Sequence, residues 1–168
     1  MSKPSALTVL SLVALSGCTS YELAPREPST PVSLAANQAS VCVLRPHRVA
    51  ALAPAVVRDN GQLVGMTRGP SHFCYLVQPG RHAIVSTYGD DIDRKLGLAQ
   101  DVTASLDAAG GQTYFLHHDV SGLITLAVRW VPSSAAPAMM ADTDEVVLTS
   151  APDDERLPEP GAVVAAAP

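Results

Sequence analysis

The chain has 168 residues, a mass of 17.5 kDa and a formal net charge of −5 at pH 7, with 47% hydrophobic residues. This length suits one domain. The negative charge argues against a nucleic-acid-binding protein that works by neutralising phosphates. No apolar run reaches the roughly 18 residues of a membrane-spanning helix, which excludes a protein that crosses a membrane several times.

The first residues have the pattern of a secretory signal peptide. Lys3 supplies a positive charge, and residues 6–15 form a short apolar run. The tetrapeptide Leu15-Ser16-Gly17-Cys18 resembles the bacterial lipobox. This resemblance implies removal of residues 1–17 and attachment of a covalent diacylglycerol and an N-acyl lipid to Cys18, and no other cofactor is expected. The alternative is an ordinary signal peptide whose cleavage leaves a free thiol at Cys18.

Lipidation of Cys18 would anchor the protein to a membrane. Each buried methylene contributes about 0.8 kcal/mol, so two or three acyl chains make release negligible. Thr19 and Ser20 follow the cysteine, without the aspartate that resembles an inner-membrane retention signal. We therefore expect a protein of the bacterial cell envelope, on the periplasmic side of the outer membrane, with the inner membrane as the less favoured alternative.

Two segments have the composition of disordered chain. Residues 18–38 hold several prolines and almost no large apolar side chains, which predicts a lipid-tipped, flexible linker. Residues 149–168 hold four prolines and an acidic patch at residues 153–155, which predicts a disordered tail. Residues 39–148 then form the folded domain.

Strand-like patterns follow one another through this domain. The segments are short and β-branched or alternating, and Gly, Pro or Asn turns separate them. The pattern predicts an all-β fold, an antiparallel β-sandwich of about seven or eight strands, with a short helix only at 135–141. Nine segments are candidates for these strands: 40–45, 55–59, 62–67, 72–77, 81–88, 98–106, 112–117, 123–131 and a last one at 144–148.

Three turns predict hairpins between these strands. Asn60-Gly61 accepts the positive φ angles of a type I′ turn, and Pro79-Gly80 suits a type II turn. Gly110-Gly111 separates the third pair of strands. Strand alternation predicts the core. Its expected members are Val41, Val43, Phe73, Tyr75, Val77, Ile124, Leu126, Val128 and Trp130.

A series of short motifs runs through roughly residues 39–131. The motifs are Val41-x-Val43-x-Arg45-Pro46, Asp59-Asn60-Gly61-x-x-Val64-Gly65, Gly69 with Phe73, Pro79-Gly80-x-His82, and Leu106-x-Ala108-x-Gly110-x-x-x-Tyr114-Phe115. In this order they resemble an uncharacterised family of small bacterial lipoproteins, with a domain of unknown function related to PEGA-type β-sandwich domains. The resemblance implies a fold and a location, but no activity and no catalytic residue.

Cys42 and Cys74 remain as a pair once Cys18 is lipidated. In an oxidising compartment they form a disulfide if their strands are neighbours, or they stay as two buried thiols. A disulfide would close a loop of roughly 30 residues and contribute about 3–4 kcal/mol. The absence of a Cys-x-x-Cys pair argues against redox catalysis and against a zinc site.

The other candidate groups do not predict a metal site. His117 and His118 are adjacent, so on a strand they face opposite ways, and His72 and His82 lie on other predicted strands. Residues 90–93 contain three aspartates without the spacing of a calcium loop, which favours a solvated loop. The four aromatic residues Tyr75, Tyr114, Phe115 and Trp130 are expected in the core, with a sugar- or peptide-binding platform as the alternative.

No enzyme motif is present, so we expect a non-enzymatic protein. The expected function is a lipid-anchored β-sandwich that binds an envelope partner, either a protein or peptidoglycan, and no nucleic acid. One alternative is a lipoprotein component of a secretion system or of envelope assembly. Another is an envelope hydrolase that uses His117 or His118 with Asp119 as acid–base groups.

Overall fold

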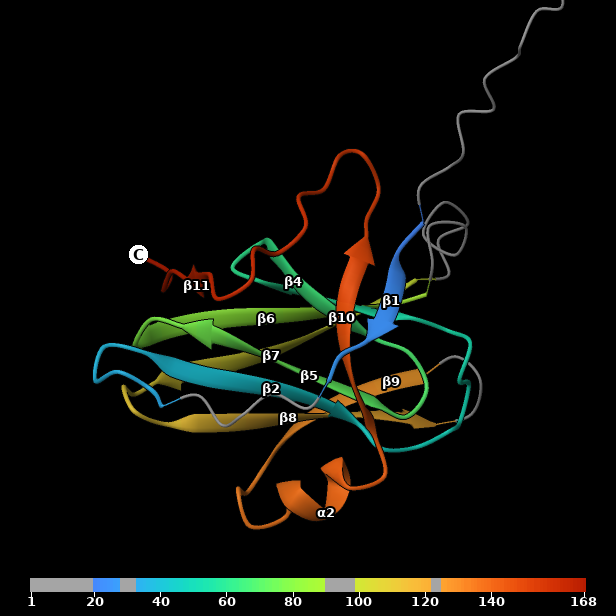
Figure 1. Cartoon of the computed structure of the whole chain (residues 1–168), viewed down its shortest axis with the longest axis horizontal. Coiled ribbons are helices and arrows are strands. Elements are labelled where there is room, and N and C mark those ends of the chain that lie inside the picture. Colours follow the sequence, from blue (N-terminus) through green and yellow to red (C-terminus); the bar gives the residue numbers. More distant parts are fainter. Residues whose placement is uncertain (1–19, 28–32, 90–98, 122–124) are drawn as a thin grey trace, which may run out of the picture.

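The computed structural model describes residues 20–27, 33–89, 99–121 and 125–168. Within these ranges the chain forms eleven strands and the short helix α2 (Ala136–Met140), arranged as two packed sheets (Figure 1). The predicted all-β sandwich is confirmed, with somewhat more strands than expected. The strands are β1 (Glu22–Pro25), β2 (Ala39–Arg45), β3 (Ala55–Asp59), β4 (Gln62–Thr67), β5 (Ser71–Val77), β6 (Gly80–Tyr88), β7 (Gln100–Ala108), β8 (Thr113–Ser121), β9 (Thr125–Val131), β10 (Asp144–Ser150) and β11 (Val163–Val164).

The two sheets differ in size and in strand direction. The large sheet has the order β1-β10-β5-β2-β8-β9, with β11 also pairing with β5, and the small sheet has the order β4-β3-β6-β7. Most neighbouring strands are antiparallel. The pairs β2–β8, β5–β10 and β5–β11 are parallel, so the expectation of a purely antiparallel sandwich is wrong for these three. Parallel pairing arises because these strands are joined by connections that leave the sheet rather than by tight turns.

The turn at Asn60-Gly61 joins β3 and β4 as a hairpin, as predicted. Asn60 has a φ of 49° and Gly61 a φ of 81°, the two positive values that a type I′ turn requires. Asp59 pairs with Gln62 across this turn. The local turn chemistry was therefore sufficient to define this hairpin.

The other two predicted hairpins are wrong. Pro79-Gly80 leads from β5 in the large sheet to β6 in the small sheet, and Gly110-Gly111 leads from β7 in the small sheet to β8 in the large one. Turn residues permit the chain to reverse, but they do not decide which strand becomes its hydrogen-bonded neighbour. At each of these turns the following strand, β6 or β8, lies in the other sheet, because the two sheets bury their apolar faces against each other.

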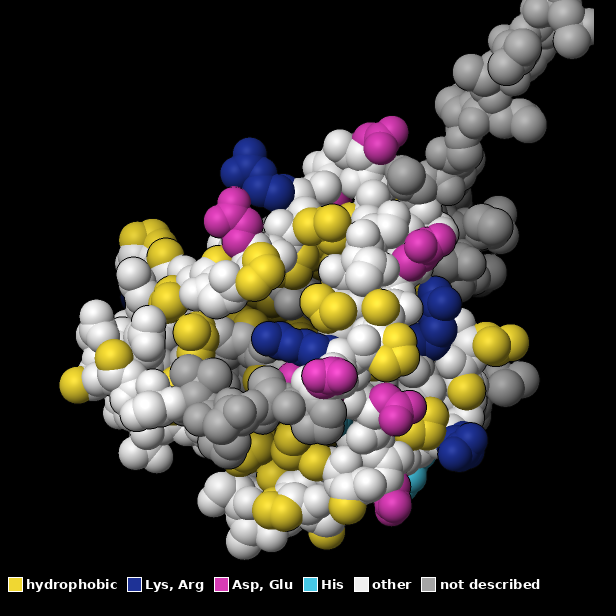
Figure 2. Space-filling model, viewed as in Figure 1, with side chains coloured by type: hydrophobic (Ala, Val, Ile, Leu, Met, Phe, Trp, Pro, Cys, Tyr) yellow, Lys and Arg dark blue, Asp and Glu magenta, His cyan; other side chains and the backbone are white. Residues whose placement is uncertain are grey.

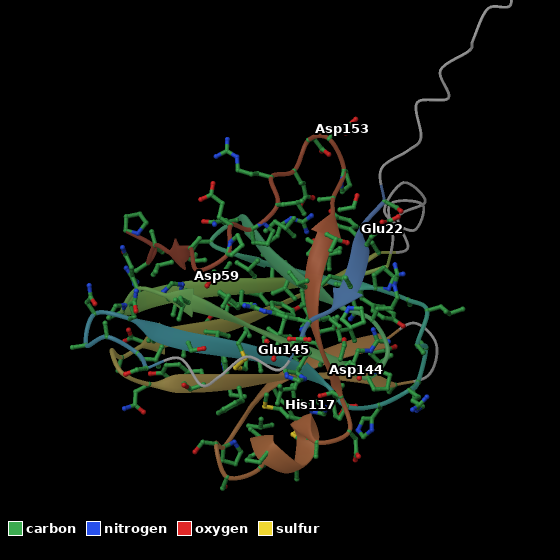
Figure 3. The ribbon with its side chains drawn as sticks, in the orientation of Figure 1. Glu22, Asp59, His117, Asp144, Glu145 and Asp153 are labelled. Atoms are coloured by element: carbon green, nitrogen blue, oxygen red, sulfur yellow. A yellow bond between two sulfur atoms is a disulfide. The ribbon has the colours of Figure 1, made fainter. Side chains whose placement is uncertain are left out.

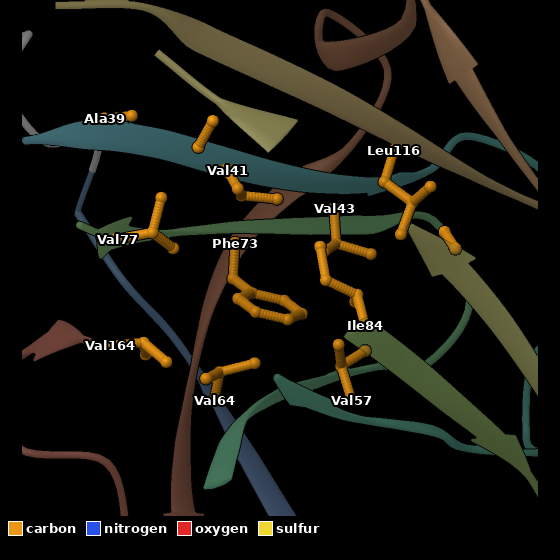
Figure 4. Packing of buried hydrophobic residues seen from close by; sticks show 12 residues of the cluster. Ala39, Val41, Val43, Val57, Val64, Phe73, Val77, Ile84, Leu116 and Val164 are labelled. Carbon is orange, nitrogen blue, oxygen red and sulfur yellow. The ribbon is translucent and has the colours of Figure 1, made fainter. Parts of the chain in front are cut away.

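The main core lies between the sheets (Figure 4). Val41, Val43 and Phe73 from the large sheet meet Val57 and Ile84 from the small sheet, and all five are at most 6% exposed. Among the other predicted core residues, Val77 and Leu126 are buried, while Tyr75, Val128 and Trp130 pack at the margins of their clusters. Ile124 lies outside the described residues.

The expectation of a flexible linker over residues 18–38 is wrong for its first described part. Residues 22–25 form β1 and pair with β10, and Tyr21 is only 5% exposed. The Tyr21 hydroxyl donates to Glu155 and accepts from Arg58. An edge strand tolerates proline, because one side of its backbone needs no partner, so the proline content was misleading.

The expectation of a disordered tail over residues 149–168 is also wrong. This segment begins with the end of β10 and later forms β11, where Val164 is 4% exposed against the main core. Asn60 donates to the carbonyl of Ala165, and the amide of Ala167 donates to Arg81. A few apolar and backbone contacts therefore hold a segment whose average composition suggested disorder. The predicted helix and last strand are both present, as α2 and β10.

Candidate functional site

The strand β8 carries His117 and His118 to opposite faces of the large sheet, as their adjacency predicted. His118 faces the small sheet, and His117 lies on the outer face near α2 (Figure 3). The register of β2 on β8 places Leu44 beside His117 and Val43 beside Leu116. The two faces are therefore distinct environments.

On the inner face, His118 is completely buried and bonded through both ring nitrogens. Its Nδ1 lies 3.0 Å from Thr67 Oγ1, and its Nε2 lies 2.9 Å from Ser86 Oγ. Burial lowers the pKa of His118 to about 3, and the nearby Arg45 and His117 add to this effect. The neutral ring joins the two sheets, and it cannot reach a substrate.

A second buried network closes the other end of the sandwich. His82 Nδ1 lies 2.9 Å from Asp59 Oδ2, its Nε2 lies 2.9 Å from the carbonyl of Gln78, and the Tyr75 hydroxyl donates to Asp59. Burial raises the pKa of Asp59, while His82 and Tyr75 act in the opposite direction. The side chains of Asp59 and His82 are fully enclosed, so this network is structural.

Arg45 organises the loop that follows β2. Its side chain is buried, and its guanidinium donates to the carbonyls of Val49, Ala50 and Ala53. Ala50 has a φ of 48°, a left-handed conformation that these bonds stabilise. The loop 46–54 is therefore held from inside by one cation, and it presents Leu52 at 89% exposure.

On the outer face, the structure joins Cys42 and Cys74 by a disulfide. The two residues are direct partners in the β2–β5 register. Cys42 packs with Leu44 and Ala136 in a small cluster, where Phe115 and Met140 also contribute. The helix α2 thus covers part of this face.

Among the described residues, one group of three side chains has the composition of a metal site. His47 of the loop 46–54 and His117 and Asp119 of β8 each offer a ligand atom, and these atoms lie within 4.8 Å of one another. The rings of His47 and His117 meet edge to face, with centroids 5.9 Å apart. The sequence did not predict this group. His47 lies outside the predicted strands, and it reaches His117 only because its loop folds back onto β8.

Arg129 of β9 lies against the same group. Its Nε donates to His117 Nδ1 at 3.0 Å, and its Nη2 lies 3.9 Å from Asp119 Oδ2. Burial lowers the pKa of His117, and Arg129 and His47 lower it further while Asp119 opposes them. His117 is 1% exposed, and its Nε2 has no hydrogen-bond partner.

A groove of about 720 Å³ opens beside β5, on the side of this strand that faces away from β2. The strand β10 pairs only with Ser71 and His72, and β11 pairs only with Leu76 and Val77. Between them, no described strand pairs with this edge at residues 73–75. Hydrophobic side chains surround a hollow on the face shown in Figure 2. The groove lining includes Phe73, Leu76, Phe115, Met140, Val147 and Pro160, with Arg26, His72 and Glu145 as charged or polar members.

The four aromatic residues that were expected in the core do not form one surface, which the alternative of a sugar- or peptide-binding platform requires. Tyr114 and Trp130 form an edge-to-face pair on the main core, and Trp130 donates to the carbonyl of Ser105. Phe115 lies with the α2 cluster, and Tyr75 belongs to the Asp59 network. Cys18 and residues 90–93 lie outside the described residues.

No family model matches the chain, and searches of the curated proteins and of the solved structures also found no match. The resemblance to a lipoprotein family therefore stays a prediction. Within the described ranges, no helix is long and apolar enough to cross a membrane.

Proposed function

We propose that this protein is a lipid-anchored component of a bacterial envelope, and that its β-sandwich binds an envelope partner without catalysing a reaction. The observation that carries this proposal is the tetrapeptide Leu15-Ser16-Gly17-Cys18 after a short apolar run. Lipid on Cys18 would confine the domain to a thin layer at a membrane. Confinement raises its effective concentration towards partners in that layer.

The start of the folded body adds a geometric consequence. Tyr21, three residues after Cys18, is already buried and bonded to Arg58 and Glu155. Three extended residues span about 10 Å. A lipid on Cys18 would therefore hold the sandwich close to the membrane, not at the end of a long tether.

The disulfide is consistent with the same location. Disulfides persist in the periplasm and are rare in the cytosol. Cys74 is an exposed residue, and a cytosolic location would place its disulfide under reducing conditions. An oxidising compartment is the simplest setting for this bond.

The groove beside β5 is the surface that we propose for the partner, and we propose a protein segment as that partner. An open strand edge offers backbone donors and acceptors to an added strand, and an apolar lining accepts its side chains. Charges at the lining include the ion pair of Arg26 with Glu145, at 3.9 Å. Peptidoglycan, a sugar-rich polymer, fits this apolar lining less well.

Two measurements test the proposal. Metabolic labelling with palmitate is expected to mark the wild type and to leave Cys18→Ala unlabelled; equal labelling of both would contradict the anchor. A photo-crosslinking residue at Val147, which lines the groove at 38% exposure, should capture a protein partner in membranes. The matched control is the same residue at Leu52, which is 89% exposed outside the groove; equal capture at both positions would contradict the assignment of the groove.

A further inference from the structure

The group of His47, His117 and Asp119 has the residue types and the spacing of a metal site. It contains two imidazoles and one carboxylate, it draws them from a loop and a strand, and its ligand atoms lie within 4.8 Å of one another. One member, His117, is buried with an unpartnered nitrogen. Because Nδ1 accepts from Arg129, the unpartnered Nε2 carries the ring proton, and this buried N–H has a desolvation cost. A metal ion on Nε2 would take the place of that proton, which would move to Nδ1.

We propose that His47, His117 and Asp119 form a binding site for one divalent transition-metal ion of the Zn²⁺ type. Imidazole nitrogen suits Zn²⁺, Cu²⁺ and Ni²⁺, and a carboxylate completes a common mixed ligand set. Three protein ligands leave at least one position for water or for a group from a partner. His47 is exposed on its loop, so it can close the remaining distance to the ion.

Arg129 is the group that competes with this ion. Its guanidinium contacts both His117 Nδ1 and the Asp119 carboxylate, so a cation already lies between two of the ligands. An ion on Nδ1 would take the lone pair to which Arg129 donates. An ion on Nε2 would leave the proton on Nδ1, which then cannot accept from Arg129. Either mode of binding therefore requires Arg129 to move away.

This movement is feasible because the Arg129 side chain is 62% exposed. Its pairing with Asp119 at 3.9 Å is a surface contact, and such contacts contribute little. The repulsion between the guanidinium and a divalent ion would nevertheless weaken binding in the wild type. Removing Arg129 should tighten binding about tenfold.

Metal binding would tie the loop 46–54 to β8. Arg45 already holds this loop from the inside through the carbonyls of Val49, Ala50 and Ala53. An ion on His47 would fix the loop from the outside as well. The exposed Leu52 at its tip would then be presented in one conformation.

The experiment is a titration of the full-length protein with Zn²⁺ after treatment with EDTA, followed by calorimetry. The wild type should bind one equivalent of Zn²⁺. His47→Ala should bind at least about tenfold more weakly, whereas Arg129→Ala should bind about tenfold more tightly. Co²⁺ in place of Zn²⁺ supplies a second readout, because its visible absorption depends on the ligands and should change in His47→Ala.

Val49→Ala is the matched control, since it alters the same loop and keeps the backbone carbonyl that Arg45 uses. It should bind Zn²⁺ like the wild type. Failure of the wild type to bind at millimolar Zn²⁺, or equal affinities of the wild type and His47→Ala, would overturn the proposal. The site does not depend on the lipid anchor, so these results and the labelling of Cys18 can fail independently.

Discussion

The two faces of the large sheet differ in how they accommodate polar side chains at β8. On the inner face, both nitrogens of His118 are bonded, to Thr67 and to Ser86. On the outer face, His117 has one nitrogen bonded to Arg129 and one without a partner. These two adjacent residues therefore differ: His118 is bonded through both ring nitrogens, and His117 through only one.

This difference indicates which face is available for ligands. Native interiors satisfy nearly all their buried polar atoms, so the closed network around His118 contributes to stability and leaves no position for a further ligand. The outer face has an incomplete histidine, an exposed loop histidine and a disulfide that stabilises the sheet beneath them. If the two faces differ in this way, substitutions on them should have unequal effects on stability and on metal binding.

Loss of the outer disulfide should have the largest effect on stability. Replacing Cys42 and Cys74 together by alanine removes a crosslink with a sequence separation of 32, and the free energy of unfolding should fall by about 3–4 kcal/mol. Urea unfolding of the oxidised wild type and the variant measures this change. A difference below about 1 kcal/mol, or two free thiols in the wild type after alkylation, would show that the bond is not formed.

His118→Ala should destabilise the protein by about 3 kcal/mol, since it opens a cavity and leaves the hydroxyls of Thr67 and Ser86 without their partner. The matched variant is His117→Ala, which also opens a cavity but breaks only the bond to Arg129, so it should cost less, about 2 kcal/mol. Urea unfolding of both variants gives the comparison directly. A larger loss for His117→Ala would reverse the assignment of the two faces.

Low pH should reduce the free energy of unfolding through the buried His118 of the inner face. The folded state keeps His118 neutral, with a pKa of about 3, whereas the unfolded chain gains a proton near pH 6.5. The free energy of unfolding should therefore fall by about 1.4 kcal/mol per pH unit below 6.5, a loss of about 2 kcal/mol at pH 5. His72 and His117, whose pKa values burial also lowers, add to the loss.

The control for this pH effect is His118→Gln, measured with EDTA present. Glutamine keeps a donor and an acceptor but does not titrate, so the slope of stability against pH should become shallower by about one proton. Equal slopes for the wild type and His118→Gln between pH 5 and pH 6.5 would show that His118 does not remain neutral.

The smallest expected effect on stability is that of His47→Ala. His47 is an exposed loop residue, and such substitutions usually change stability by less than about 0.5 kcal/mol. Thermal unfolding without metal should therefore be unchanged. The same variant should lose the stabilisation that Zn²⁺ gives the wild type, and a stabilisation that persists in His47→Ala would place the ion elsewhere.

The sequence correctly predicted a turn whose conformation depends on neighbouring residues alone, but not the strand pairings that depend on the whole fold. Asn60-Gly61 defined a hairpin because positive φ angles at two successive residues leave few alternatives. Pro79-Gly80 and Gly110-Gly111 also reverse the chain, but the two strands that each turn joins lie in different sheets and do not pair with each other. The ordered ends were missed for a related reason, because a few contacts, among them the buried Tyr21 and Val164, hold segments whose average composition is polar and proline-rich.

The candidate site shows the same limit. The alternation of β8 correctly placed His117 and His118 on opposite faces. It could not bring His47 to His117, since that approach depends on a loop that Arg45 folds through three carbonyl bonds. The sequence held one signal for this loop, an arginine at the end of a strand pattern directly before Pro46. In the structure this arginine is buried, so its guanidinium needs several acceptors close by.

The proposed function depends on the claim that Cys18 is lipidated, and the mass of the processed protein is the sharpest test of that claim. Mass spectrometry of the protein extracted from bacterial membranes should find Cys18 as the first residue, carrying a diacylglycerol thioether and an N-acyl chain. A chain that retains residues 1–17, or one that begins at Cys18 with an unmodified thiol, would contradict the claim.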